Sequence, residues 1–547
     1  MKKIEEIRSY CLNCKNSQCR IKGCPLSNCI PEFIHEVDSK KAYEILCNTT
    51  VLPAICGRIC PHEKQCEGSC IRGIKGEPVS IGAMEAYIGD LSIENNYELS
   101  IEVDERAKDK RVAVIGSGPA GLTCAAFLAR RGVKVTIYEK HYKLGGLLTH
   151  GIPEFRLPRE VVEKTIEKIL DLGVETKLNQ ELGRDFEIED LAKKYDAVFV
   201  AIGANIPTKM NVEGENLNGV YGGNYLLEYN KHPNYTGKKV AIIGGGNVAI
   251  DVARTSTRVG DYNVSMFCLE DRANMPASEE EIEEAVEEGV KLDCGWGPKE
   301  ILTENGKVTG IVLKRCTSVK DADGRFNPQY DENDTKTVKC SHVFLSIGQT
   351  TIWGDLLKGT KVEIDGVRVK ADKLTYQTTD PDVFIGGDVY TGPRFAIDAI
   401  AAGKEAAISI HRYVQPHSSL TIGRNRRDFI ELDKNNIKVE SYDNSSRQIP
   451  GTDNSFDHKK SFRDAKLTFT EEQVKAETAR CLGCGASVVD PNKCIGCGIC
   501  TTKCEFDAIH LNRDLPECST MRKSEDKLKY ILPYGAKQAI KIKFKKK

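Results

Sequence analysis

The 547-residue sequence predicts an α/β fold in which two parallel-sheet domains, one inserted into the other, lie between two cysteine-rich segments. Two glycine-rich turns each follow an apolar strand and open a helix, which is the βαβ pattern of a Rossmann-like domain. A further apolar strand near residue 383 returns the chain to the first of these domains. Ten of the 22 cysteines fall within the first 70 residues, and a second group lies near the C-terminus.

Residues 1–105 are the predicted first domain, which is small and helical. Its cysteines are spaced as Cys11-x₂-Cys14-x₄-Cys19-x₄-Cys24 and Cys56-x₃-Cys60-x₅-Cys66-x₃-Cys70. In a long chain without secretory features, closely spaced thiols favour metal binding over disulfides. We therefore expect this domain to be held together by bound metal rather than by a large core.

The first glycine-rich turn follows the predicted strand 111–115. Gly116, Gly118 and Gly121 allow backbone amides to approach a pyrophosphate at the N-terminus of the next helix. Glu139 ends the following strand, 23 residues beyond Gly116, where an acid accepts hydrogen bonds from ribose hydroxyls. The pattern predicts one dinucleotide site.

The second turn follows strand 239–243, and its site residues are Gly244, Gly246, Asn247 and Ala249. Two dinucleotide units in one chain indicate FAD and a nicotinamide nucleotide. The predicted FAD-binding domain comprises residues 106–220 and 346–415, and the NAD(P)-binding domain is the insertion 221–345. After the returning strand, Gly386 and Asp388 are expected at the ribityl or phosphate part of the flavin.

The ribose end of the second unit favours NADH. An acid after the second strand suits NAD, whereas NADP binding usually needs an arginine for the 2′-phosphate. This strand ends Phe267-Cys268-Leu269-Glu270-Asp271-Arg272, so Glu270 stands at the acidic position.

Residues 416–475 are polar and predict a linker or docking arm, followed by a ferredoxin-like domain at 476–520 and a basic tail at 521–547. The run Cys494-x₂-Cys497-x₂-Cys500-x₃-Cys504 matches the ferredoxin loop that wraps a [4Fe–4S] cube, whereas zinc normally uses two separated cysteine pairs. Cys481 and Cys484 leave a second cluster open. The segment holds seven cysteines, and two all-cysteine clusters need eight.

Charge and hydropathy limit the partners. The formal net charge is −1 and the pI is about 6.8, which gives no drive toward nucleic acid. The charged start lacks the apolar region of a signal peptide, and no apolar run is long enough for a membrane span. We expect a cytoplasmic protein.

From Cys11 to about His411 the chain resembles the small subunit of glutamate synthase and its relatives, which include the N-terminal half of dihydropyrimidine dehydrogenase and NAD(P)H-dependent ferredoxin oxidoreductases. The motifs that carry the resemblance are Cys56-Gly57-Arg58-Ile59-Cys60-Pro61, Cys66-Glu67-Gly68-Ser69-Cys70, Gly145-Gly146-Leu147, Gly151-Ile152-Pro153-Glu154-Phe155-Arg156-Leu157-Pro158, Met275-Pro276-Ala277-Ser278 and Gly386-Gly387-Asp388. They add Gly146, Leu147 and Arg156 to the expected cofactor-binding residues. A helix begun near Ala396 and Ile397 would direct its N-terminal dipole at the reduced flavin.

The resemblance implies two N-terminal [4Fe–4S] clusters. One would be held by Cys11, Cys14, Cys19 and Cys70, and the other by Cys24, Cys60, Cys66 and Glu85. The sequence alone leaves open that Glu85 is an exposed helix residue.

The expected function is an oxidoreductase that passes a hydride from NAD(P)H to FAD and then single electrons through [4Fe–4S] clusters. The acceptor would be a ferredoxin or a partner redox subunit in a hetero-oligomer. One alternative is the small subunit of glutamate synthase feeding its large subunit, and another is a redox-sensing or scaffold iron–sulfur protein. NADPH-using relatives carry an Arg-Arg pair where this chain has Leu269-Glu270, and the appended cysteine segment suggests a different electron acceptor.

Overall fold

The structure is a computed structural model that describes residues 2–421 almost continuously, and only short stretches beyond them. Residues 16, 75, 205, 230–232, 234, 236, 261–262 and 417 are not described. After residue 421 the described residues are 424, 446, 448–455, 467–479 and a few positions between 526 and 536. The chain divides into two compact units, Met1–Thr421 and Ile422–Lys547.

The N-terminal domain is helical. Its helices are α1 (Lys2–Tyr10), α2 (Ile30–His35), α3 (Ser39–Cys47), α4 (Pro53–Ile59) and α5 (Ile81–Glu94), with short helical turns at Cys19–Gly23, His62–Lys64 and Ile71–Ile74. Local signals set the starts of two of them: Asp38 accepts hydrogen bonds from the Lys40 and Lys41 amides at the start of α3, and a proline opens α4.

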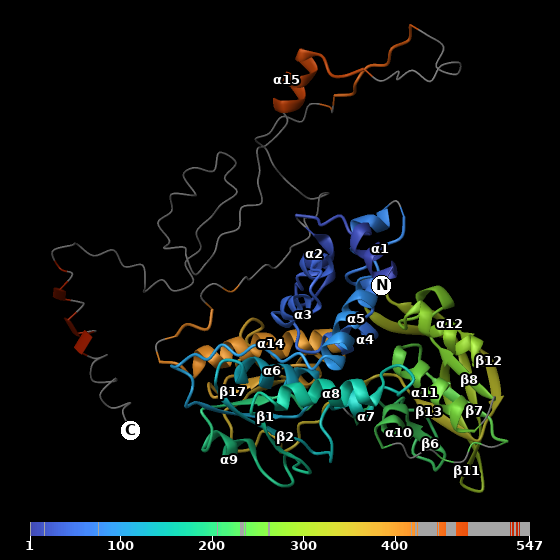
Figure 1. The fold of residues 1–547 in the computed structure, drawn as a ribbon. Helices are drawn as coiled ribbons and strands as arrows, with labels where there is room; N and C mark the ends of the chain where they lie inside the picture. Colours follow the sequence, from blue (N-terminus) through green and yellow to red (C-terminus); the bar gives the residue numbers. More distant parts are fainter. Residues whose placement is uncertain are drawn as a thin grey trace. The chain divides into compact units, whose positions relative to one another are not determined.

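The second domain is built on a parallel five-stranded sheet in the order β17-β4-β1-β2-β3. The strands are β1 (Arg111–Ile115), β2 (Lys134–Tyr138), β3 (Glu175–Lys177), β4 (Ala197–Val200) and β17 (Val383–Ile385). Its helices are α6 (Pro119–Ala129), α7 (Leu147–His150), α8 (Arg159–Leu170), α9 (Ile188–Ala192), α13 (Asp388–Thr391) and α14 (Ala396–Tyr413). Figure 1 shows α6 and α14 on one side of the sheet and α9 on the other.

The alternation of side chains along β1 explains these layers. Val112 and Val114 point into the core beneath α6, α8 and α14, whereas Ala113 and Ile115 join the core that contains α9. A strand buried on both faces reads as a continuous apolar run, which is the pattern seen in the sequence.

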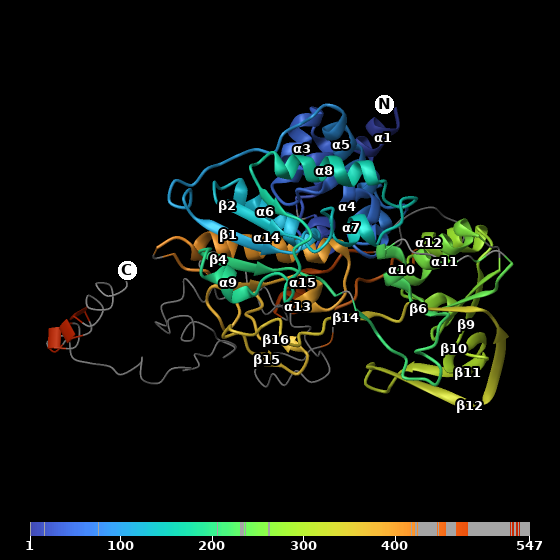
Figure 2. The same cartoon turned by 90° about the horizontal axis from the view of Figure 1, so that it is seen from below.

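The inserted domain lies between β4 and β17. Its parallel sheet has the order β6-β13-β7-β8-β9. The strands are β6 (Val220–Gly222), β7 (Val240–Ile243), β8 (Val264–Cys268), β9 (Lys291–Cys294) and β13 (His342–Leu345), and the helices are α10 (Gly223–Tyr229), α11 (Asn247–Val259) and α12 (Glu279–Glu287). An antiparallel sheet of β10 (Trp296–Glu304), β11 (Lys307–Lys320) and β12 (Phe326–Lys339) packs on one face of this parallel sheet, where its side chains share a core with β7, β8 and β13 (Figure 2). The predicted fold class, with one nucleotide-binding domain inserted into another, is confirmed.

Short two-stranded pairs complete the described elements. The entry and exit of the insertion pair with each other, β5 (Ile206–Pro207) against β14 (Gln349–Thr350). A second pair joins β15 (Ile364–Asp365) to β16 (Arg368–Val369), and α15 (Glu471–Ala479) belongs to the C-terminal unit. None of the helices described is long and apolar enough to cross a membrane.

Two of the three domains share a hydrophobic core, and the inserted domain has separate cores. One cluster of buried residues runs from the N-terminal helices, including Phe33 and Met84, to Val114 and Ile400 of the first sheet domain. The inserted domain has two cores of its own, one around Ile242 and Phe344 and one around Ile243 and Ile311. The N-terminal domain and the first sheet domain are therefore packed as one body.

Candidate functional site

A cavity of about 470 Å³ lies at the carboxyl edge of the first sheet, where parallel α/β sheets bind their ligands. Residues from all three domains line it. Those expected from the sequence are Gly116, Gly118, Glu139, Gly146, Leu147, Arg156, Asn247, Gly386, Asp388 and Ala396. Gly121 and Ile397 are among the expected residues that do not line it, and Ile397 is buried in the core.

The first glycine turn requires glycine at two positions, one for its backbone conformation and one for a close contact. Gly116 has φ of +100°, and a Cβ on Gly121 would lie 1.9 Å from the Gly116 carbonyl oxygen. Gly118 is the N-cap of α6, and a Cβ added there would meet no atom within 4 Å. The chain thus leaves open space in front of a helix N-terminus, an arrangement that suits a phosphate group.

Glu139 is held against this turn. Its Oε2 accepts hydrogen bonds from the Ser117 amide at 2.9 Å and the Ser117 hydroxyl at 2.5 Å, and Oε1 accepts from the His141 amide at 3.0 Å. The same Ser117 hydroxyl accepts from the Gly145 amide at 3.0 Å. Asp388 also lines the cavity, and burial raises the pKa of its carboxyl to about 7.

The second glycine turn has the same construction. Gly246 is the N-cap of α11 and has open space where a side chain would stand, while Ala249 is fully buried. Gly244 has φ of +140° and packs on the Ser346 carbonyl.

The Met275–Ser278 loop is bonded to this turn. The Ala277 amide donates to the Gly245 carbonyl at 3.1 Å, and the Ser278 amide donates to Asn247 Oδ1 at 3.1 Å. Lys64 of the N-terminal domain donates to the Pro276 and Ala277 carbonyls at 3.1 and 3.3 Å.

Glu270, which is expected to face the ribose, adjoins the second glycine turn. Its Oε2 lies 2.9 Å from the position of a Cβ on Gly245. Arg272, the nearest cation in sequence, forms an ion pair with Glu279 at 2.5 Å. The Glu270 carboxylate is therefore not neutralised by Arg272.

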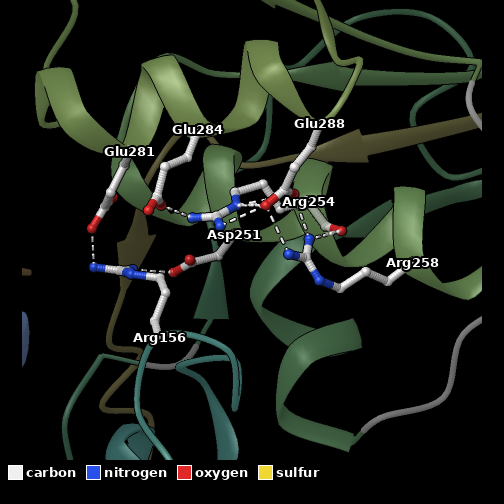
Figure 3. A network of polar contacts seen from close by, with 7 residues as sticks. All are labelled: Arg156, Asp251, Arg254, Arg258, Glu281, Glu284 and Glu288. Atoms are coloured by element: carbon white, nitrogen blue, oxygen red, sulfur yellow. Dashed lines mark hydrogen bonds and ion pairs between the residues drawn. The ribbon is translucent and has the colours of Figure 1, made fainter.

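A network of ion pairs links the two sheet domains (Figure 3). Arg156, from the loop before α8, pairs with Asp251 of α11 at 2.6 Å and with Glu281 of α12. Arg254 of α11 continues the network to Glu284 and to Glu288, the latter at 2.7 Å. Asp251 also lines the cavity, and its buried Oδ1 has no hydrogen-bond partner among the residues that the structure describes.

A second polar contact joins the same domains. Glu228 of α10 accepts hydrogen bonds from Lys140 and His141, both at 2.9 Å, and all three side chains line the cavity. Sequence reasoning singled out neither this cluster nor Asp251. Lys140 and His141 directly follow Glu139, and this position in the sequence could have suggested a role at the site. Their partner Glu228 lies 87 residues beyond His141, and only the fold brings it to them.

The N-terminal cysteines fall into two groups. Cys11, Cys14, Cys19 and Cys70 line one small pocket together with apolar side chains. Each of Cys11 and Cys19 has its thiol pKa raised, first by burial and further by the neighbouring thiols of this set. The four residues that the family resemblance assigns to one cluster thus converge on a single pocket.

The second group surrounds Glu85, which is buried on α5 rather than exposed. Burial raises the pKa of the Glu85 carboxyl to about 8. Its charge in turn acts on the thiols of Cys24, Cys60 and Cys66. Ile59, the residue before Cys60, lines the large cavity, so this group lies next to that cavity.

Every described cysteine is a free thiol. Within the described ranges no three His, Cys, Asp or Glu side chains are close enough to hold a single metal ion. A cubane cluster is larger than one ion and spaces its thiolates accordingly, so both convergent groups fit it. Cys481, Cys484, Cys494, Cys497, Cys500 and Cys504 lie outside the described residues.

Comparison with known proteins assigns the family. Residues 110–403 match the pyridine nucleotide-disulphide oxidoreductase family, residues 2–97 match domain II of dihydropyrimidine dehydrogenase with its 4Fe–4S cluster, and residues 487–510 match a 4Fe–4S binding domain. The glutamate synthase [NADPH] small chain of Escherichia coli (strain K12) is 35% identical over 427 residues, covering 74% of this chain and 90% of that protein. This chain belongs to the family of the glutamate synthase small chain. The family resemblance inferred from the motifs is confirmed.

Two other relatives of the glutamate synthase small-chain family match a larger share of this chain. The beta subunit of NADP(+)-dependent formate dehydrogenase from Moorella thermoacetica is 32% identical over 503 residues, covering 85% of this chain and 70% of that protein. The beta subunit of NADPH-Fe(3+) oxidoreductase from Geobacter sulfurreducens (strain DL-1 / KN400) is 32% identical over 506 residues, covering 84% and 74%. The chain is accordingly an NAD(P)H-dependent flavoprotein oxidoreductase with 4Fe–4S domains that transfers electrons.

Proposed function

We propose that this chain is the electron-input subunit of a larger redox enzyme, in which it oxidises NADH and delivers single electrons to a ferredoxin or a partner redox subunit. When bound, FAD would accept one hydride, which carries two electrons, from the nicotinamide, and the [4Fe–4S] clusters would pass these electrons on one at a time. The observation that carries the proposal is the shared cavity. The two glycine turns contribute Gly118 and Asn247 to it, and Ile59 brings in the neighbour of Cys60.

The proposed roles follow from the geometry. Gly116, Gly118 and Gly146 line the space for the flavin nucleotide, and Gly121 lets α6 pack closely on the Gly116 carbonyl. Glu139 would accept hydrogen bonds from the ribose, and Asp388 and the N-terminus of α14, which begins at Ala396 and Ile397, would hold the rest of the flavin. Gly244, Gly246, Asn247 and Ala249 form the nicotinamide nucleotide turn. Leu147 and Arg156 also line this cavity, and we propose that they contact the bound cofactors.

We assign the two N-terminal clusters to the two convergent cysteine groups. Glu85 is the proposed non-cysteine ligand of the inner cysteine group, which is formed by Cys24, Cys60 and Cys66. One C-terminal cluster is proposed on Cys494, Cys497, Cys500 and Cys504. The involvement of Cys481 and Cys484 is a separate proposal that iron analysis of the full chain would test.

The NADH preference rests on Glu270. A carboxylate beside the glycine turn accepts from ribose hydroxyls and repels a 2′-phosphate, and Arg272 is engaged by Glu279. Three further carboxylates, at Glu279, Glu280 and Glu281, occupy the first turn of α12 next to the same loop. The relatives above are named for NADPH or NADP(+), so this preference would distinguish the chain from them.

The partner is proposed to be a redox subunit other than the glutamate synthase large subunit. The formate dehydrogenase and Fe(3+) oxidoreductase subunits match 84–85% of this chain, against 74% for the glutamate synthase small chain. The glutamate synthase role is the second candidate, favoured by the higher identity of that relative.

Anaerobic stopped-flow reduction tests the proposal. The holoenzyme is mixed with NADH or NADPH, flavin bleaching is followed, and samples are frozen for cluster EPR. We expect bleaching followed by reduced-cluster signals, with kcat/KM at least about tenfold higher for NADH, equivalent to about 1.4 kcal/mol. Bleaching with every cluster left oxidised would contradict the electron-conduit role.

Glu270→Gln should reduce the preference for NADH, and Glu287→Gln, an exposed carboxylate at the far end of α12, should not. A tenfold preference for NADPH in the wild type would show that the assignment of Glu270 is wrong.

A further inference from the structure

Two cysteines of the inserted domain lie outside every cluster motif. Cys268 is the last residue of β8, and Cys294 is the last residue of β9. The two strands are parallel neighbours, and their register places Cys268 directly opposite Cys294. Register partners on adjacent strands project to the same face of a sheet and stand one interstrand spacing apart, about 4.8 Å.

The two thiols face the same core and interact directly. Both side chains belong to the hydrophobic cluster beneath α11 and α12, in which Cys268 is 2% exposed and Cys294 is partly exposed. Burial and, after it, the Cys294 thiol raise the pKa of the Cys268 thiol, so the two side chains are close enough to interact. Adjacent strands hold their Cα atoms within the separation that a disulfide spans, about 4.4–6.8 Å.

The pair also touches the nicotinamide nucleotide site. The Cβ of Cys268 lies 3.0 Å from the position of a Cβ on Gly245, in the centre of the second glycine turn. The Cys268 thiol donates to the Glu270 carbonyl at 3.5 Å, and the Cys294 thiol contacts Met275 Sδ at 3.9 Å. Glu270 and Met275 are the two ends of the segment that wraps this turn.

We propose that Cys268 and Cys294 form a reversible disulfide, by exchange with a low-molecular-weight disulfide, that weakens binding of the nicotinamide nucleotide. The effect on binding rests on the proposed function of the second glycine turn. The site of modification itself does not, because it follows from strand register and thiol contact alone.

The exchange has a definite order and balance. The more exposed Cys294 loses its proton to solvent and attacks one sulfur of the small disulfide, which releases one small thiolate and leaves a mixed disulfide. Cys268 then loses its proton and attacks the Cys294 sulfur, which releases the second small thiolate. The protein dithiol is oxidised by two electrons, and the small disulfide is reduced to two thiols.

The surroundings set the rate of exchange. Burial raises the pKa of both thiols, so the thiolate fraction at neutral pH is small and exchange is slow. The Arg272 guanidinium opposes this rise at Cys294, which supports Cys294 as the attacking residue.

The consequence for binding follows from tight packing. A disulfide brings two Cβ atoms to about 3.8 Å and fixes the torsion between them. Cys268 is already packed against Gly245, and Glu270 follows it by two residues. A shift at the end of β8 therefore moves the carboxylate at the ribose position and the floor of the turn together.

The experiment incubates the anaerobic holoenzyme with glutathione disulfide, maps the peptides without reduction and measures the KM for NADH. We expect a peptide that links Cys268 to Cys294, an increase in KM of about tenfold, and recovery of both on addition of dithiothreitol. Cys294→Ser should give no linked peptide and no response of KM to the oxidant. Cys340→Ser, a buried thiol of the same domain whose pKa is shifted by burial alone, should respond as the wild type does.

Three outcomes would overturn the proposal. They are a failure to form the linked peptide while other thiols of the chain are modified, a linkage to the nearby Cys316 instead, and a linked peptide with an unchanged KM. If NADH failed to bleach the flavin of the untreated wild type, the proposed function would fail, and peptide mapping would still decide whether the disulfide forms.

Discussion

Arg156 is one of the residues that join the two nucleotide-binding domains. Its single guanidinium faces two buried carboxylates, Asp251 and Glu281 (Figure 3). Burial raises the pKa of Asp251 to about 6 and that of Glu281 to about 7, even though Arg156 opposes the rise at both. Arg156 and Arg254 together do not offset the burial of both carboxylates, so Glu281 retains its proton in a substantial fraction of molecules near pH 7.

This arrangement predicts a pH dependence of stability. Glu281 has a higher pKa in the folded protein than its ordinary value of 4.5, so the folded state binds more protons. Its contribution is fully present below pH 4.5 and is lost as pH rises through about 7. Between pH 5.5 and 7.5 the free energy of unfolding should fall, by about 1–3 kcal/mol, and Glu281→Gln should flatten this slope. Thermal unfolding followed by flavin fluorescence measures it.

Glu288 provides the matched control. It lies on the same network but pairs with Arg254 and Arg258, and the hydrogen bond from Arg258 lowers its pKa to about 2. Its contribution is present above pH 4.5 and is lost only as pH falls toward 2. Glu288→Gln should therefore leave the slope between pH 5.5 and 7.5 unchanged. Equal slopes in wild type and Glu281→Gln would contradict the explanation that Glu281 retains its proton.

Glu85 is a second buried carboxyl, and a bound metal cluster is the ligand that we propose for it. It is a buried carboxyl on α5 among the thiols of Cys24, Cys60 and Cys66. We predict that Glu85→Ala loses iron equivalent to one N-terminal cluster, whereas Glu85→Asp retains most of it. Iron analysis and EPR of the reduced protein check this. Full cluster content in Glu85→Ala would remove Glu85 from the ligand set.

At the scale of elements, helix α14 connects the cavity to the inner cysteine group. Phe395, Ala396 and Ala399 line the cavity at its N-terminus, and Lys404 follows two turns later. Lys404 has no ion pair among the described residues, and its electrostatic neighbours include the Cys24 and Cys29 thiols, Glu405 and Arg20. A largely buried ammonium needs a compensating anion, which an anionic cluster on Cys24 would supply.

We predict that Lys404→Met makes one N-terminal cluster harder to reduce. Removing a nearby positive charge destabilises the reduced, more negative form. A tenfold change in the one-electron equilibrium corresponds to about 59 mV, and a decrease of roughly that size is expected. An EPR-monitored redox titration measures it, with exposed Lys361→Met, remote from the cysteines in sequence, as the control. Equal potentials in wild type and Lys404→Met would separate Lys404 from the cluster.

The elements that could be predicted from sequence are those with a strong local signal. Each glycine turn between an apolar strand and a helix was found where the pattern placed it, because the turn requires glycine and a buried parallel strand requires a continuous apolar run. The antiparallel strands β10–β12 were not predicted, since β12 is mostly exposed and polar and its charges conceal the strand pattern. The contacts of Glu228, Lys64 and Asp251 join segments far apart in the chain, and only the fold brings them together.

At the scale of the whole molecule, an apolar core joins the N-terminal domain to the first sheet domain, whereas mainly polar contacts join the inserted domain to both. The N-terminal domain and the first sheet domain share one apolar core, which fixes the inner cysteine group relative to the cavity. The inserted domain has its own cores and is tied to the rest by β5 and β14, by Arg156 and Glu228, and by Lys64. Polar contacts exchange with water more readily than a packed core, so the nucleotide-delivering domain is the one free to adjust.

Mutation of the C-terminal cysteine run should affect electron exit without affecting hydride entry at the cavity. The run Cys494–Cys504 is distant in sequence from the cavity and matches a 4Fe–4S binding domain, so it is expected to serve electron exit rather than hydride entry. Cys497→Ser in the full-length protein should remove one cluster signal, leave flavin bleaching by NADH within about twofold of wild type, and lower ferredoxin reduction by at least about tenfold. Cys518→Ser, outside the run, is the matched control. Stopped-flow bleaching and a coupled ferredoxin assay measure the two steps, and an unchanged rate of ferredoxin reduction in Cys497→Ser would place the exit at the N-terminal clusters instead.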